Sequence, residues 1–103
     1  MGFLDFLFGS KKNQVEEFIN KGAVVIDVRT QREWNNGHIE NSIHIPLDQL
    51  QRRLAEIKKL NKPIITVCES GVRSGNASKF LKENNLEAVN GGGWKSFSRH
   101  VSM

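Results

Sequence analysis

Cysteine is nearly absent from this chain of 103 residues, which contains a single one, Cys68. One cysteine excludes an intramolecular disulfide and a cysteine-rich zinc site. It also excludes a second, resolving thiol within the chain, so any covalent intermediate on Cys68 must be discharged by an acceptor from outside. A lone thiol fits a reducing compartment, and we therefore expect a cytoplasmic protein.

Proline is also scarce, with two residues, and no apolar run is long enough to span a membrane. The remaining composition is ordinary, which argues against a disordered or fibrous chain. The length fits one domain that needs no disulfide or metal for stability. The net charge is +4, but the basic residues form no stripe interleaved with aromatics. We therefore expect no nucleic-acid partner, and a mild positive field that favours a small anionic substrate.

The first 12 residues form an apolar N-terminal segment that we separate from a domain over residues 13–103. Its apolar side chains recur at helical spacing and are followed by two lysines: Phe3, Leu4, Leu7 and Phe8, then Lys11 and Lys12. Three interpretations stay open. The segment packs on the domain, it meets a protein partner or a second copy of the chain, or it rests on a membrane surface.

Strand-like and helix-like patterns alternate along the domain, joined by short links. The first half is predicted to contain a helix from Asn13 ended by Gly22, a strand over Ala23–Val28, a short helix opened by a capping box of Thr30 and Glu33, and a strand over Ile43–Pro46. A helix capped by Asp48 follows, with Leu50, Leu54 and Ile57 on its inner face, and then a strand over Ile64–Val67. The last predicted elements are a helix through Ala77, Phe80 and Leu81, a short strand over Glu87–Val89, a loop over Gly91–Gly93 and a last helical turn with Trp94 and Phe97. This alternation predicts an α/β fold with a small parallel sheet of four or five strands and helices on both faces. Sites of such sheets lie beyond the carboxyl ends of the strands, where Asp27 and Cys68 are expected.

The segment from Cys68 to Ser74 carries the predicted chemistry. An apolar run ends at Cys68 and a helical pattern begins just after it. Unpaired N–H groups and the positive end of the helix dipole stabilise a thiolate at such a place. Gly71 permits a backbone conformation that turns successive N–H groups inward, Arg73 adds a cation, and Ser70 and Ser74 add hydroxyl groups. The sequence therefore predicts an anion cradle around a nucleophilic cysteine.

Four motifs in this order resemble the rhodanese family of sulfurtransferases, over roughly residues 13–100. They are Ile26–Arg29 with Glu33-Trp34 and Gly37–Ile39, Asn41–Pro46 with Ser42 where alanine is more common, Cys68–Ser74, and Gly91–Trp94. The resemblance implies a rhodanese-like fold and Cys68 as nucleophile and sulfur carrier. Thiosulfate or a related anionic donor would give a sulfur atom to Cys68 as a persulfide, and cyanide or a thiol would accept it. No metal or organic cofactor is implied.

The resemblance implies that substrate is bound by the residues of the loop after the cysteine: Glu69, Ser70, Gly71, Val72, Arg73 and Ser74. We add Arg29 as a candidate substrate-binding residue because it could line the pocket entrance. Structural support is expected from Asp27, His38 and Trp94. Related phosphatases of the same fold have a loop one residue longer than the four residues between Cys68 and Arg73, so phosphatase activity is disfavoured.

Other roles stay open beside these. Cys68 could be an inert buried thiol, and Arg73 could form a surface ion pair at the start of its helix. Arg29 either lines the pocket entrance or pairs with Glu33. Glu69 opposes a thiolate unless its side chain faces solvent. As a whole, the chain is either a sulfurtransferase or a non-catalytic domain that binds a partner or relays sulfur.

Overall fold

The structure, a computed structural model, describes residues 13–101. The apolar segment 1–12, with its three interpretations, lies outside the described residues. The elements in chain order are a helix over residues 13–20, β1 (Val24–Asp27), α2 (Gln31–Asn35), β2 (Ile43–His44), a 3-10 turn η1 (Leu47–Gln49), α3 (Leu54–Lys59), β3 (Ile64–Cys68), α4 (Val72–Glu83), β4 (Ala88–Gly93) and α5 (Trp94–Val101).

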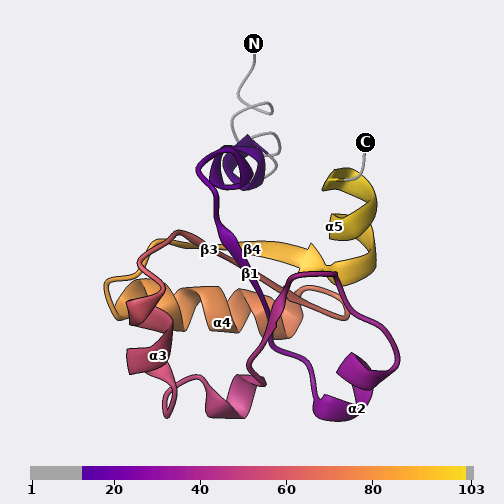
Figure 1. Cartoon of the computed structure of the whole chain (residues 1–103), viewed down its shortest axis with the longest axis horizontal. Coiled ribbons are helices and arrows are strands. Elements are labelled where there is room, and N and C mark those ends of the chain that lie inside the picture. Colours follow the sequence, from indigo (N-terminus) through magenta and orange to yellow (C-terminus); the bar gives the residue numbers. More distant parts are fainter. Residues whose placement is uncertain (1–12, 102–103) are drawn as a thin grey trace.

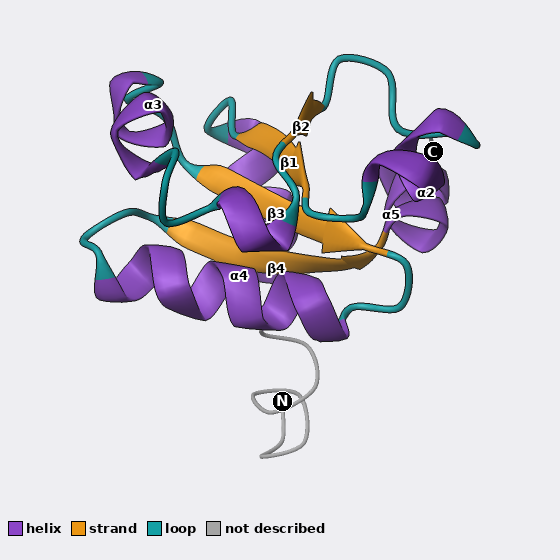
Figure 2. Cartoon of the chain, turned by 90° about the horizontal axis from the view of Figure 1, so that it is seen from below, coloured by secondary structure: helices purple, strands orange, loops and turns teal. Residues whose placement is uncertain are grey.

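Four parallel strands form one sheet in the described part of the chain, in the order β2-β1-β3-β4. Figure 1 shows α3 and α4 on one side of the strands and the helix over residues 13–20 with α5 on the other side. Figure 2 shows the same layers from below. The predicted α/β fold with helices on both faces is confirmed, with four strands rather than five in the part that the structure describes.

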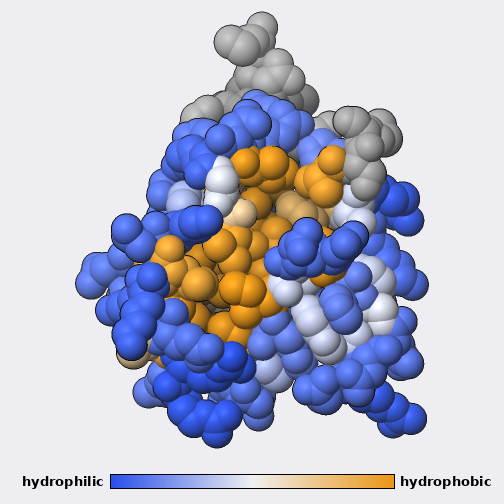
Figure 3. Space-filling view, in the orientation of Figure 1, coloured by the Kyte–Doolittle hydropathy of each residue, from blue (hydrophilic) through white to orange (hydrophobic). Residues whose placement is uncertain are grey.

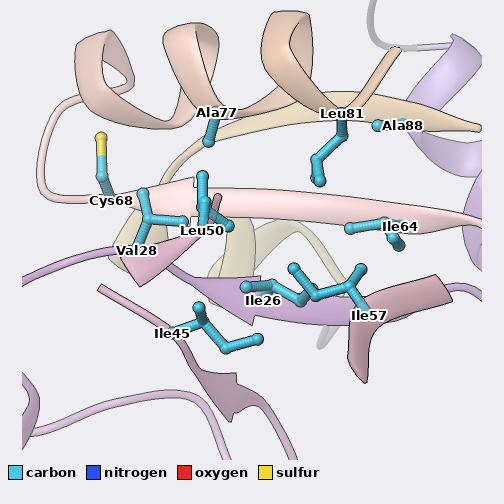
Figure 4. Packing of buried hydrophobic residues seen from close by; sticks show 10 residues of the cluster. All are labelled: Ile26, Val28, Ile45, Leu50, Ile57, Ile64, Cys68, Ala77, Leu81 and Ala88. Carbon is cyan, nitrogen blue, oxygen red and sulfur yellow. The ribbon is translucent and has the colours of Figure 1, made fainter. Parts of the chain in front are cut away.

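Each face of the sheet has its own apolar core. The core under α3 and α4 is built mainly from β1, β3 and these helices, and Figure 4 shows it: Ile26, Val28, Ile45, Leu50, Ile57, Ile64, Cys68, Ala77, Leu81 and Ala88. The core under the first helix and α5 contains Val15, Phe18, Ile65, Val67, Val89 and Phe97. Alternate residues of β3 thus enter opposite cores, which fixes the register of this central strand.

The local helix signals act as their residue types require. Thr30 caps α2, its hydroxyl accepts from the Glu33 N–H, and the Glu33 carboxylate accepts from the Thr30 N–H. Gly22 ends the first helix with a φ of +80°, a conformation that favours glycine. These two boundaries agree with the sequence prediction because caps depend on residues a few positions apart.

The helix predicted to start at Asp48 is wrong in its extent. Pro46 precedes η1, and α3 begins only at Leu54. The backbone of Arg53, with φ −104° and ψ 17°, is not helical, and its side chain donates to the His44 carbonyl and to Gln49 Oε1. Leu50 and Ile57 are buried as expected, so the apolar spacing was informative although one helix became two short pieces.

The glycine run after Val89 is strand, not the predicted loop. Gly91–Gly93 completes β4, and the pairing with β3 shifts between Thr66 and Val67. A side chain at Gly91 would place a Cβ 2.7 Å from Ile65 Cγ2, and one at Gly93 would place it 2.8 Å from the Glu69 carbonyl oxygen. The glycines therefore let β4 approach β3 closely, and also the loop that follows Cys68 and leads into α4, called the cysteine loop below. The last helix is also longer than the predicted single turn.

The first half of β1 is apolar and open on the side where the short edge strand β2 lies. β3 pairs with all of β1, whereas β2 pairs only with Ile26 and Asp27. Val24 and Val25 therefore have no strand beside them on that edge among the described residues, and both are half-buried. Figure 3 shows an apolar area over the middle of this side of the molecule. No helix in residues 13–101 is long and apolar enough to cross a membrane.

Candidate active site

Cys68 is the last residue of β3 and has no solvent-exposed surface. Its Sγ accepts a hydrogen bond from the Gly71 N–H at 3.0 Å and lies 3.2 Å from the Ser74 hydroxyl. Figure 4 shows Cys68 at one end of the apolar core, with its sulfur directed toward the start of α4. The thiol thus lies between a core and a polar turn, with its reactive atom on the polar side.

The turn between β3 and α4 places its N–H groups around this sulfur because of one glycine. Gly71 is the N-cap of α4 and has a φ of +99°, a backbone region that other residues adopt at a cost. A Cβ there would also contact the Gly92 Cα at 3.4 Å. Thr66 Oγ1 donates to the Ser74 carbonyl at 2.8 Å and anchors the first turn of α4 to β3.

The pKa of Cys68 is lowered by this environment. Burial of the thiol raises its pKa, but hydrogen bonds from the Ser74 hydroxyl and from the N–H groups of Ser74, Gly71 and Ser70 outweigh that effect. The net result favours the thiolate, which is the nucleophilic form of cysteine. The side chains of Ser70 and Val72 are exposed, Val72 to 70%, so only the backbone of Ser70 bears on the thiol.

Arg73 forms an ion pair with Glu33 of α2. Its two terminal nitrogens lie 2.7 and 2.9 Å from the two Glu33 oxygens. This bidentate pair corresponds to the alternative role considered for Arg73 from the sequence. Hydrogen bonds from Arg73 and from the Thr30 N–H, opposed by burial, lower the pKa of Glu33 to about 2. Glu33 therefore stays ionised, accepts from the Thr30 N–H in the capping box of α2 and links that helix to the start of α4.

Arg29 lines a cleft beside the site, as one of the two sequence interpretations expected, but its ion pair is with Asp27 rather than with the Glu33 carboxylate. Its side chain is 2% exposed and pairs with Asp27, with 2.7 Å between Nη2 and Oδ2. Arg29 has five N–H donors, and hydrogen bonds account for all of them: Nε to Asp27, Nη2 to Asp27 and the Gly37 carbonyl, and Nη1 to the Glu33 carbonyl and Glu69. No donor is left for a substrate, so the role of Arg29 is to hold the residues around the site in place.

A cleft of about 210 Å³ lies beside the cysteine loop, lined by Arg29, Glu33, Asn36, Glu69, Trp94 and Lys95. Glu69 accepts from Trp94 Nε1 at 3.3 Å and from Arg29 at 3.5 Å. Its carboxylate is thus held against these two residues. The Arg29 guanidinium also stacks on the Trp94 ring, 4.6 Å from its centroid. Trp94 is therefore a wall of the cleft, and Lys95 adds a cation at its rim.

The two histidines near this cleft stack on Trp34. The His38 ring lies 3.5 Å from that of Trp34, and its Nδ1 lies 2.9 Å from the Trp34 carbonyl oxygen. The His44 ring stacks at 4.7 Å, and its Nε2 lies 2.8 Å from the Arg29 carbonyl oxygen. Both rings fix the chain around α2. Within residues 13–101 no cluster of side chains could hold a metal ion.

Sequence reasoning missed Asn90 on β4. Its Nδ2 donates to the Gly71 carbonyl at 3.0 Å, and its Oδ1 lies 2.9 Å from the Gly92 nitrogen and 2.7 Å from Ser74 Oγ. Asn90 thus joins both sides of the cysteine loop to β4. The only available signal was a polar residue at the entry to a glycine run, which does not indicate a partner.

The sequence model of the rhodanese-like domain matches residues 11–100. This chain belongs to the rhodanese-like domain family. The match spans β1, the cysteine loop and β4, so the arrangement described above is that of a rhodanese-like domain.

Relatives of this rhodanese-like domain include both short and long proteins. YqhL of Bacillus subtilis is 37% identical over 87% of this chain and 75% of that protein. The tRNA uridine(34) hydroxylase of Cronobacter sakazakii is 33% identical over 65% of this chain, but only 21% of that protein is matched. The domain thus recurs as a small part of larger proteins.

Similar solved structures likewise include both short and long proteins. A rhodanese-like domain protein from Staphylococcus aureus superposes with a TM-score of 0.67, at 34% identity over 74% of each chain. An NAD-dependent persulfide reductase from A. fulgidus gives a TM-score of 0.58, at 37% identity over 73% of this chain and 14% of that one.

Proposed function

We propose that this rhodanese-like domain is a sulfurtransferase with Cys68 as its nucleophile and sulfur carrier. The Cys68 thiolate attacks the outer sulfur of a donor such as thiosulfate. The sulfur–sulfur bond of the donor breaks, and its electron pair leaves with sulfite. The resulting persulfide gives its outer sulfur to cyanide or to an acceptor thiol, and the Cys68 thiolate is restored.

One observation carries this proposal: the Cys68 sulfur lies in a turn whose hydrogen bonds lower its pKa. An inert core cysteine has no need of such donors. The same donors would hold the negative charge of a persulfide after the first step. Since the chain has no second cysteine, the sulfur must leave to a separate acceptor.

Access to the sulfur is part of the proposal. Cys68 has no exposed surface, whereas Glu69, Ser70 and Val72 in its loop are exposed. A donor therefore reaches Sγ only when part of this loop moves. Arg73 faces Glu33, so an anionic donor would share this cation with a carboxylate already in place.

The experiment is the intact mass of the protein after incubation with thiosulfate, beside the Cys68→Ser variant. We expect the wild type alone to gain one sulfur atom and to lose it on addition of cyanide. An equal gain in Cys68→Ser would show that the sulfur is not carried by the thiol. No gain with thiosulfate or with low-molecular-weight persulfides would contradict sulfur transfer by this domain.

A second candidate is a sulfur-relay or binding domain that works with other proteins and does not take sulfur from thiosulfate. The specific support is the recurrence of the domain as 14% of a persulfide reductase and 21% of a tRNA hydroxylase. The apolar first half of β1, which no strand pairs on its β2 side among the described residues, offers such a partner a surface. We propose that the segment 1–12 takes part in protein contact or self-association, in the cytoplasm. The same mass experiment separates the candidates, because a relay domain accepts sulfur from a persulfide but not from thiosulfate.

A further inference from the structure

The Ser74 hydroxyl faces two acceptors but has one hydrogen. Ser74 Oγ lies 3.2 Å from Cys68 Sγ and 2.7 Å from Asn90 Oδ1. Ser74 and Cys68 are fully buried, whereas Asn90 is half-buried and its Oδ1 also accepts from the Gly92 N–H. A hydroxyl group donates one hydrogen bond and accepts others. The hydrogen of Ser74 can therefore serve Asn90 or the sulfur, but not both at once.

The orientation of the Asn90 amide is fixed by its other neighbours. Its Nδ2 donates to the Gly71 carbonyl at 3.0 Å, and its Oδ1 accepts from the Gly92 N–H at 2.9 Å. Rotating the amide by half a turn would set an NH₂ group against the Gly92 N–H and an oxygen against the Gly71 carbonyl. The atom that faces Ser74 is therefore an oxygen, which can only accept.

Two protonation states of Cys68 consequently need two positions of the Ser74 hydrogen. With a neutral thiol, S–H donates to Ser74 Oγ and the hydroxyl donates to Asn90, so every group is paired. When a base from solvent removes the thiol proton, the hydroxyl can turn to the sulfur. Asn90 Oδ1 then accepts from the Gly92 N–H and faces the oxygen of Ser74 with no hydrogen between them.

We infer that Asn90 is a positioning residue of this site, whose carbonyl oxygen draws the Ser74 hydroxyl hydrogen away from Cys68 and releases it when the thiol ionises. Asn90 touches neither the reacting sulfur nor a donor and acts through Ser74. It moderates the thiolate that the backbone N–H groups favour. The inference deepens the proposed function, but it concerns the ionisation of Cys68 alone and can be tested without sulfur transfer.

The test is the rate of alkylation of Cys68 by iodoacetamide as a function of pH, which one cysteine makes unambiguous. The variants are Asn90→Ala, Ser74→Ala and the double variant. Removing the competing acceptor should lower the midpoint of the pH profile by about 0.5 to 1 pH unit, since one neutral hydrogen bond is at stake. Below the midpoint, Asn90→Ala should then react about three- to tenfold faster than the wild type.

The double variant separates positioning from support of the loop. In the Ser74→Ala background there is no hydroxyl to compete for, so Asn90→Ala should leave the midpoint unchanged. A loosened loop would instead raise the rate plateau at high pH, where all the thiol is ionised. An equal midpoint shift in both backgrounds, or an upward shift in Asn90→Ala, would overturn the inference.

A second measurement needs no change at Asn90 and covers a variant that fails to fold. The S–H stretching band of the single thiol should lie at lower frequency in the wild type than in Ser74→Ala, because S–H donates to Ser74 only in the wild type. Identical bands would mean that the thiol does not donate to Ser74, and the competition with Asn90 would be refuted. Failure of sulfur loading with thiosulfate, by contrast, would leave both results standing.

Discussion

Asp27→Asn should destabilise the domain strongly, because Asp27 neutralises the buried Arg29. Asp27 Oδ1 accepts from the Arg29 N–H and Nε, and Oδ2 accepts from Nη2 at 2.7 Å. The side chains are 0% and 2% exposed. Asparagine has the same shape but no charge, and its NH₂ group would face an arginine donor. The variant therefore leaves the buried cation with only the distant, half-exposed Glu69 carboxylate, 3.5 Å from Nη1, as a charged hydrogen-bond partner.

The size of the effect follows from that burial. Removing one partner of a buried, hydrogen-bonded ion pair costs about 3–5 kcal/mol. A domain of this size has a total stability of about 5–15 kcal/mol. The variant should thus lose a large share of its free energy of unfolding, and its melting temperature should fall by at least about 12 °C.

Urea unfolding followed by tryptophan fluorescence measures this loss, since Trp94 stacks on Arg29 and reports on that region. Asp48→Asn is the matched control, because Asp48 is an exposed carboxylate in η1 and its loss should change stability by less than about 0.5 kcal/mol. If Asp27→Asn loses less than about 1 kcal/mol, Arg29 does not depend on Asp27. The structural role assigned to Arg29, which is to hold the residues around the site in place, would then be refuted.

Two further predictions concern α2 and the N-terminus. Glu33→Gln should lower stability at neutral pH by about 1–2 kcal/mol, discounted for the partial exposure of the pair with Arg73. Because the pKa of Glu33 falls from 4.5 to about 2 on folding, this contribution is complete above pH 4.5 and disappears toward pH 2. Thermal melts of both proteins across that range should converge at low pH, and a constant gap would contradict the assignment. Removal of residues 1–12 should shift gel-filtration elution to a smaller species, and an unchanged monomer would argue against self-association through that segment.

Much of the fold was written locally in the sequence. The Thr30 capping box, the Gly22 helix end and the unbroken apolar runs of β1 and β3 each depend on residues within a few positions. Signals of this kind can be recognised in the sequence without knowledge of the tertiary contacts. The position of Cys68 at the carboxyl end of a strand followed from the same patterns. The order of motifs then led to the rhodanese-like family, which the family match confirmed.

The tertiary structure alone decided which partner each polar side chain found. Arg73 and Glu33 are 40 positions apart, and Ser74 and Asn90 are 16 apart. Nothing in the spacing of such residues indicates a contact, because it arises only when parallel strands bring distant loops to one edge of the sheet. The same reason explains why the glycine run predicted as a loop is part of β4. These glycines are required where β4 lies close to Ile65 and Glu69, and that contact exists only in the packed sheet. The sequence by itself determined an α/β fold with Cys68 at the end of a strand and predicted that this cysteine is a nucleophile, and packing determined the hydrogen bonds around its sulfur.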